Sequence, residues 1–175
     1  VGIATNYIKA DFHLSDSIAH VFPFMVFLWF FLLSLPTSML MNRIGCRKTV
    51  LLSVVITAIA LLFPCLDYSL GMMLVSFSLL GMGNTLIQVS LNPLLANIVS
   101  GDRLASSLTL GQFMKAIASF LGPIIAGCML LRFGNWLYLF PCFFIVALVS
   151  AIGLSAVSIE EQKQERESSF MQCLS

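Results

Sequence analysis

Long apolar runs separated by short polar segments make up most of this chain of 175 residues. A helix needs about 17–25 apolar residues to cross the hydrocarbon core of a bilayer. Five runs satisfy this length, at residues 18–41, 49–66, 70–97, 104–131 and 136–158. None shows the strict alternation of a barrel strand, and a helix satisfies its own backbone in lipid. The pattern therefore predicts an all-α fold, a polytopic transmembrane helical bundle.

The two ends of the chain differ from these runs. Residues 1–8 have no initial methionine and resemble the end of an earlier span, whereas residues 159–167 are strongly charged. We therefore expect a fragment of a longer protein. Residues 1–158 would form the transmembrane bundle, with a partial first helix and five complete ones, and residues 159–175 would begin a cytoplasmic linker.

Composition and charge agree with a multi-pass protein of the cell (inner) membrane, because 59% of the residues are hydrophobic and only 10% are charged. Lysine and arginine gather in cytoplasmic loops, so we place the polar segment after residue 41 inside. The inner side then holds Arg43, Arg47, Lys48, Arg103, Lys163 and Arg166, and the outer side Lys9 and Arg132. The lipid bilayer is the expected surrounding, and no nucleic-acid partner is expected.

Catalytic and metal-binding signatures are absent from the sequence. The five cysteines form no CxxC pair, and His13 and His20 fall at the outer edge of a span. No HExxH, GxSxG or phosphate-binding glycine loop occurs. We therefore predict no catalytic residue, no metal and no cofactor, and a membrane-embedded enzyme remains only as an alternative.

Lys115 is the charged residue least expected from its surroundings, because it interrupts the apolar run 104–131. A lysine at the centre of a membrane helix costs about 2.5–3.5 kcal/mol on insertion scales. Polar residues also recur at helical spacing on two runs. These two polar stripes are Asn84, Gln88 and Asn92, and Gln112, Lys115 and Ser119.

Gln88 and Lys115 fall at similar depth. At 1.5 Å per residue, each lies roughly 15 Å from the cytoplasmic end of its span, near the midplane where carriers bind their substrates. We predict that Asn84, Gln88, Asn92, Gln112 and Lys115 line a substrate cavity. For the asparagines, hydrogen bonds that only hold helices together remain an alternative.

A weak internal repeat favours a transporter. Residues 15–19 resemble residues 101–105, and residues 39–45 resemble residues 129–134. Because an odd number of spans separates the copies, they would face opposite sides of the membrane. Inverted repeats of this kind are typical of secondary transporters.

The segment 38–48, with the sequence SMLMNRIGCRK, resembles the signature loop Gly-x-x-x-Asp-Arg-x-Gly-Arg-Arg of the major facilitator superfamily. Arg43, Gly45, Arg47 and Lys48 carry the resemblance, whereas Asn42 replaces the aspartate and Ser38 the first glycine. The resemblance implies a gating loop whose basic side chains exchange contacts between states. A positively charged loop with no moving part is the alternative.

Residues 87–94 (IQVSLNPL) and 105–112 (ASSLTLGQ) resemble the fucose:proton symporter type of sugar permease in that superfamily. The likeness implies the six-helix N-terminal half of a twelve-helix carrier, from a partial helix 1 to helix 6, with a C-terminal half to follow. It also implies that Gln88, Gln112 and Lys115 face the sugar. Lys115 departs from the asparagine found there in that type of permease.

These observations together predict a secondary transporter that moves a sugar or sugar acid by alternating access. We expect ion coupling, with the proton as the first ion to consider, although no complete span contains a carboxylate. Lys115 needs a counter-charge, which either another part of the carrier or an acidic substrate would supply. A membrane sensor or scaffold and a transport-inactive relative remain alternatives.

Overall fold

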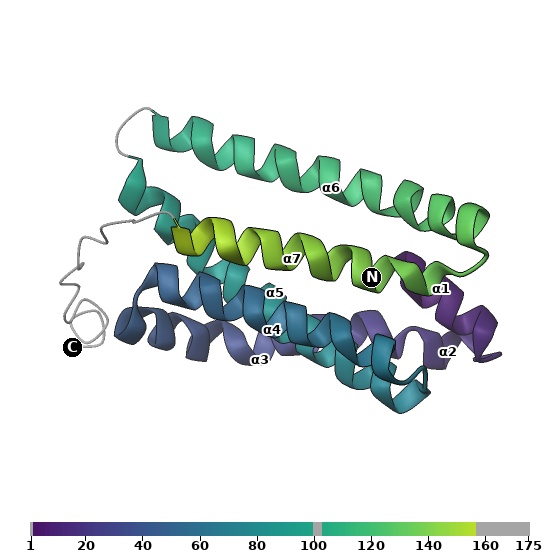
Figure 1. Ribbon diagram of the computed structural model, residues 1–175. Coiled ribbons are helices and arrows are strands. Elements are labelled where there is room, and N and C mark those ends of the chain that lie inside the picture. Colours follow the sequence, from purple (N-terminus) through teal and green to yellow (C-terminus); the bar gives the residue numbers. More distant parts are fainter. Residues whose placement is uncertain (1, 100–102, 157–175) are drawn as a thin grey trace.

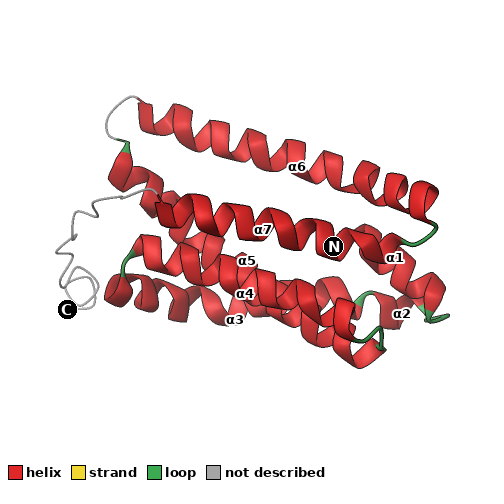
Figure 2. Cartoon of the chain, in the orientation of Figure 1, coloured by secondary structure: helices red, strands yellow, loops and turns green. Residues whose placement is uncertain are grey.

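The computed structural model describes residues 2–99 and 103–156, and in these residues the regular structure is entirely helical (Figures 1 and 2). The helices are α1 (Gly2–Asp11), α2 (Asp16–Ala19), α3 (Val21–Ile44), α4 (Cys46–Leu66), α5 (Leu70–Ile98), α6 (Arg103–Phe133), the short 3₁₀ helix η1 (Trp136–Tyr138) and α7 (Leu139–Ala156). The predicted all-α fold is confirmed.

Five helical segments are long and apolar enough to cross a membrane, as predicted: α2 with α3, α4, the greater part of α5, α6, and η1 with α7. Their ends differ from the apolar runs by a few residues. The helix α3, for example, continues past the run to Ile44, and α4 starts at Cys46 rather than residue 49. Backbone hydrogen bonding continues into the polar interface, whereas the apolar pattern marks only the hydrocarbon core. The proposed linker, residues 159–175, lies outside the described residues.

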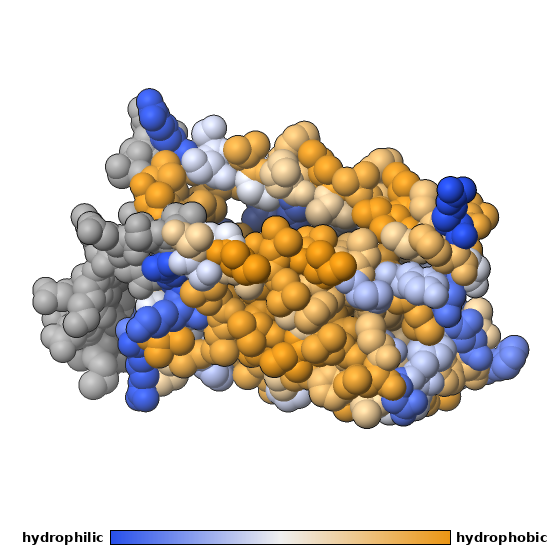
Figure 3. Space-filling view, in the orientation of Figure 1, coloured by the Kyte–Doolittle hydropathy of each residue, from blue (hydrophilic) through white to orange (hydrophobic). Residues whose placement is uncertain are grey.

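The long helices alternate in direction, so the segments that connect them gather at the two ends of the bundle (Figure 1). One end holds the α3–α4 junction with Arg43, Arg47 and Lys48, together with the start of α6. The other end, which we call the outer end, holds α1, α2, the α4–α5 turn and the α6–η1 turn. Between the two ends the visible surface is largely hydrophobic, as expected beside lipid (Figure 3).

The helices α3, α4 and α5 form the tightly packed part of the bundle, and α7 lies against α4. Small residues of α5 allow this closeness. A Cβ atom added at Gly81 would lie 2.9 Å from the Cα of Val26 in α3, and one added at Gly83 would collide with the Thr57 hydroxyl of α4. The buried Ser76 hydroxyl also donates a hydrogen bond of 2.7 Å to the Ala60 carbonyl of α4. Small polar residues of this kind join helices in membranes.

Helix α6 differs from the others because most of its side chains are exposed within the described residues. It makes few contacts with α5 and α7, and it runs beside α7 in Figure 1. The inner half of α6 nevertheless faces α5, and this is where a pocket forms.

Two glycines end one pair of the repeated segments noticed in the sequence. Gly45 and Gly134 each follow a helix, have φ values of 92° and 68°, and donate from the backbone to Met41 and Leu130. Glycine adopts a positive φ without steric penalty. The two turns lie at opposite ends of the bundle (Figure 1), as the inverted repeat requires. Part of the other pair of repeated segments, residues 101 and 102, lies outside the described residues.

Candidate functional site

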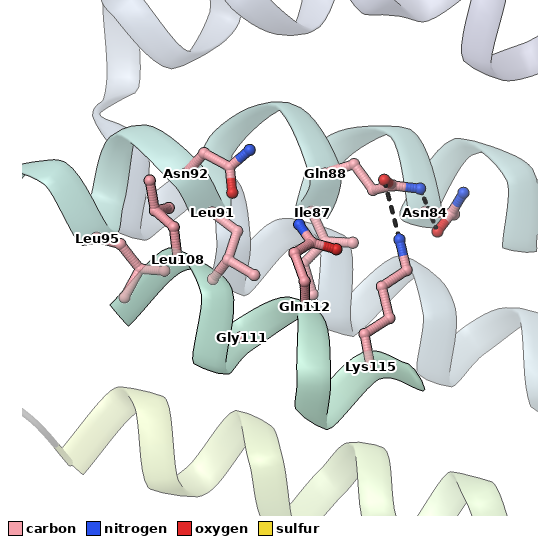
Figure 4. A pocket seen from close by; sticks show the side chains of 10 residues that line it. All are labelled: Asn84, Ile87, Gln88, Leu91, Asn92, Leu95, Leu108, Gly111, Gln112 and Lys115. Carbon is pink, nitrogen blue, oxygen red and sulfur yellow. Dashed lines mark hydrogen bonds between the residues drawn. The ribbon is translucent and has the colours of Figure 1, made fainter. Parts of the chain in front are cut away.

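A pocket of about 270 Å³ lies between α5 and α6 (Figure 4). Four amide side chains, one lysine, apolar side chains and a glycine line it: Asn84, Gln88, Asn92, Gln112, Lys115, Ile87, Leu91, Leu95, Leu108 and Gly111. All five residues that the sequence predicted for a substrate cavity therefore line one pocket. A mostly apolar wall with a few converging polar groups is the usual composition of a small-molecule site.

Three polar side chains of this pocket form a directed chain of hydrogen bonds. The Lys115 ammonium of α6 donates to Gln88 Oε1 of α5 at 3.1 Å, and Gln88 Nε2 donates to Asn84 Oδ1 at 3.2 Å. Figure 4 shows both bonds and shows Lys115 reaching across from α6 toward α5. The lysine points into the space between the helices rather than toward the membrane interface.

The local sequence explains why these side chains meet. Asn84, Gln88 and Asn92 lie four residues apart, so they occupy one face of α5. Gln112 and Lys115 lie three residues apart on α6, and Gly111 beside them has no side chain to fill the space. Asn84 and Gln88 are half-buried, whereas Asn92, Gln112 and Lys115 are exposed to the pocket opening.

The pocket lies nearer to the inner ends of its helices than to their outer ends. Gln88 precedes the end of α5 at Ile98 by ten residues, and Lys115 follows the start of α6 at Arg103 by twelve. At 1.5 Å per residue these separations correspond to roughly 15 and 18 Å. Leu95 and Leu108 extend the lining further toward the inner end.

The predicted gating loop is much shorter than its sequence suggested. Asn42 and Arg43 belong to α3, and Arg47 and Lys48 belong to α4, so that only Gly45 separates the two helices. Asn42, Arg43 and Lys48 are exposed. Arg47 is half-buried, and its Nη2 donates to the carbonyls of Leu154 at 3.3 Å and Ser155 at 2.9 Å. Arg47 therefore joins the start of α4 to the last turn of α7.

Sequence reasoning missed a polar cluster at the outer end. The Asp11 carboxylate accepts hydrogen bonds from Tyr68 Oη at 2.6 Å and from Trp136 Nε1 at 2.8 Å. Tyr7 stacks on Trp136 with ring centroids 5.4 Å apart. Burial and the bond to Asp11 raise the pKa of Tyr68 above its usual value. The partners come from α1, the α4–α5 turn and η1, and no spacing in the sequence connects them.

The acidic side chains in residues 2–99 and 103–156 are Asp11, Asp16 and Asp67. All three lie at the outer end, and Asp16 forms an ion pair with Lys9 there. None of them lines the pocket. The charge of Lys115 therefore has no carboxylate beside it among the described residues.

Comparison with known proteins identifies the family to which this sequence is related. The family model described as Major Facilitator Superfamily matches residues 1–172. The chain is similar to proteins named glucose/galactose transporter from Brucella abortus biovar 1 (strain 9-941) and Brucella abortus (strain 2308). Each is 27% identical over 132 residues, which cover 74% of this chain and 32% of the relative. The match thus spans about a third of the length of these relatives. No solved structure matches the chain significantly.

Proposed function

The chain belongs to the major facilitator superfamily, and we propose that it forms the N-terminal half of a secondary transporter that moves a sugar or sugar acid across the cell (inner) membrane by alternating access. The five long apolar helices make it a multi-pass membrane protein. The remaining C-terminal half of the same carrier would complete the translocation path.

The hydrogen-bond chain from Lys115 through Gln88 to Asn84 is the observation that carries this proposal. Amide side chains both donate and accept, and this matches the alternating donors and acceptors of sugar hydroxyl groups. The similar proteins are named glucose/galactose transporter, and this name also supports a sugar as the substrate. Asn92 and Gln112 would supply further hydrogen bonds from the two walls of the pocket.

The pocket is small for a complete binding site. Ligand pockets usually enclose about 300–1,000 Å³, and the space between α5 and α6 measures about 270 Å³. This small volume agrees with a carrier in which the two halves enclose the substrate between them, so that the pocket would be one part of the complete site. Rocking of the halves would then expose the pocket to each side of the membrane in turn.

Ion coupling belongs to this proposal, with the proton as the first ion to test. A proton-coupled site needs a group that titrates within the membrane, and the pocket contains no carboxylate. The coupling acid would therefore come from another part of the carrier. The junction of residues 42–48 would contribute the contacts that change between states, through the exposed side chains Asn42, Arg43 and Lys48, with Gly45 as the turn and Arg47 as the anchor.

Transport assays on the intact carrier in proteoliposomes test this function. We expect uptake of labelled galactose, glucose or their uronic acids to exceed that of empty vesicles and to increase with an inward proton gradient. Gln88→Ala should reduce the uptake, whereas Gly127→Ala, on an open surface of α6, should not. Binding without uptake would indicate a sensor, scaffold or transport-inactive relative, and neither binding nor uptake of any of these sugars would refute the proposal.

A further inference from the structure

We propose that the substrate carries a carboxylate, and that the Lys115 ammonium binds it. This inference rests on the proposed sugar-transport function and narrows its substrate class to acidic sugars. Among the ten residues that line it, Lys115 is cationic, four carry neutral amides and none is acidic. The pocket therefore presents one positive charge to whatever enters it.

The only polar partner that Lys115 has in the described part of the chain is a neutral one. Its ammonium donates to the Gln88 amide oxygen, which accepts one of three N–H bonds and leaves the charge uncompensated. An amide oxygen carries no negative charge, whereas a carboxylate forms a shorter and stronger charge-assisted bond with an ammonium group. Two N–H donors of Lys115 remain for such a ligand.

The direction of the hydrogen-bond chain increases the number of donors in the pocket. Lys115 holds the oxygen of Gln88 toward itself, and Gln88 Nε2 in turn donates to Asn84 Oδ1. The oxygen of each amide is thus engaged inside the chain, and the NH₂ group of Asn84 is left to donate. A ligand meets N–H donors at both ends of the chain, and a carboxylate, which only accepts, matches these two ends. The amides of Asn92 and Gln112 in the same pocket both donate and accept, and they suit the hydroxyl groups of the sugar.

The shape of the site keeps the charge-bearing end of the ligand near Lys115. Leu91, Leu95 and Leu108 form apolar walls on the side of the pocket toward the inner end. An anionic group is disfavoured against such walls. A sugar acid would therefore place its carboxylate at Lys115 and its ring beside Gln112 and the leucines.

The experiment compares two sugar pairs that differ only at C6, where a carboxylate replaces a hydroxymethyl group: glucuronate with glucose, and galacturonate with galactose. Binding is measured by calorimetry on the purified intact carrier, and uptake in proteoliposomes. We expect the unaltered protein to bind at least one uronate about tenfold or more tightly than its neutral partner. This comparison needs no variant and so does not depend on how a variant folds.

Variants then assign the preference to Lys115. Lys115→Gln should weaken uronate binding about 10- to 100-fold, the range of one charge-assisted hydrogen bond, and should change neutral-sugar binding less than about threefold. Lys115→Arg should retain the preference for the acid. Arg132→Gln removes an exposed positive charge from the outer end of the same helix and should change neither affinity.

Each contrary result has its own meaning. Transport of the neutral sugars with exclusion of both uronates would overturn the carboxylate assignment and leave the proposed function standing. If Lys115→Gln weakened the binding of the uronates and of the neutral sugars alike, the assignment would also be overturned, because the lysine would then serve an ion pair within the carrier. Failure to bind or transport any of the four sugars would refute the sugar-transport function itself.

Discussion

The guanidinium of Arg47 donates to the backbone carbonyl of Ser155 at 2.9 Å, although 108 residues separate the two in the chain. The carbonyls in the last turn of a helix have no partners within the helix and carry its partial negative charge. A guanidinium placed there donates hydrogen bonds to these carbonyls and is attracted by the partial negative charge. Arg47 therefore joins the α3–α4 junction to the inner end of α7.

We predict that Arg47→Ala lowers the stability of the protein. A hydrogen bond to a charged group contributes about 1.5–3 kcal/mol, and the lower end applies because Arg47 is half-exposed. The thermal unfolding midpoint of the purified protein measures the effect. Arg47→Lys should recover only part of it, since an ammonium lacks the planar fork of a guanidinium. An unchanged midpoint in Arg47→Ala would contradict the anchoring role.

Arg43→Ala should behave differently, because Arg43 is exposed at the end of α3. We expect slower uptake, with the unfolding midpoint and the equilibrium affinity for substrate nearly unchanged. The physical reason is distance, since Arg43 lies roughly 15 Å from the depth of the pocket and is not among the residues that line it. Parallel loss of uptake and affinity in Arg43→Ala would argue against a role in gating.

At the outer end, Asp11→Ala should destabilise the fold by about 1 kcal/mol, the lower end of the effect of leaving a buried donor without an acceptor. Trp136 is only 3% exposed and would lose its acceptor, whereas Asp11 is exposed and Tyr68 is half-buried, so water replaces part of the lost interaction. Asp11→Asn keeps one acceptor oxygen and should cost less. Asp67→Ala, an exposed change at the same end, is the control and should stay within about 0.5 kcal/mol of the unaltered protein.

We expect Tyr68 to make the free energy of unfolding depend on pH in the alkaline range. Its pKa is raised in the folded protein, so its stabilising contribution is complete below the unfolded-state pKa of about 10 and is lost as pH rises through the higher folded-state pKa. The difference in unfolding free energy between the unaltered protein and Tyr68→Phe should therefore shrink as pH rises above about 10. A difference that stays constant from pH 8 to 11 would exclude this linkage.

Gly81 and Gly127 form a matched pair for testing helix packing. In Gly81→Ala the new methyl group would meet the backbone of α3, 2.9 Å from the Cα of Val26, and overpacking of this kind costs about 1–3 kcal/mol. In Gly127→Ala the methyl group meets nothing within 4 Å, and alanine favours a helix over glycine by about 0.5–1 kcal/mol. Unfolding midpoints should thus move in opposite directions.

Much of the fold could be predicted from local pattern. Apolar run length identified the membrane-crossing helices, since lipid leaves the backbone no alternative to a helix. Helical spacing grouped Asn84 with Gln88 and Gln112 with Lys115, because residues three or four apart share a face whatever surrounds them. Depth along each helix then placed Gln88 and Lys115 near each other.

Contacts between distant segments could not be predicted in this way. The hydrogen bond from Lys115 to Gln88 depends on the angle at which α6 approaches α5, and the bonds of Asp11 depend on three segments meeting at one end of the bundle. The sequence by itself determined the helices, their polar faces and the depth of the cation, because these follow from local backbone geometry and from lipid. Only the tertiary structure decided which faces meet, why Arg47 differs from Arg43, and that the lysine turns into a pocket, because side-chain packing between helices depends on the whole chain.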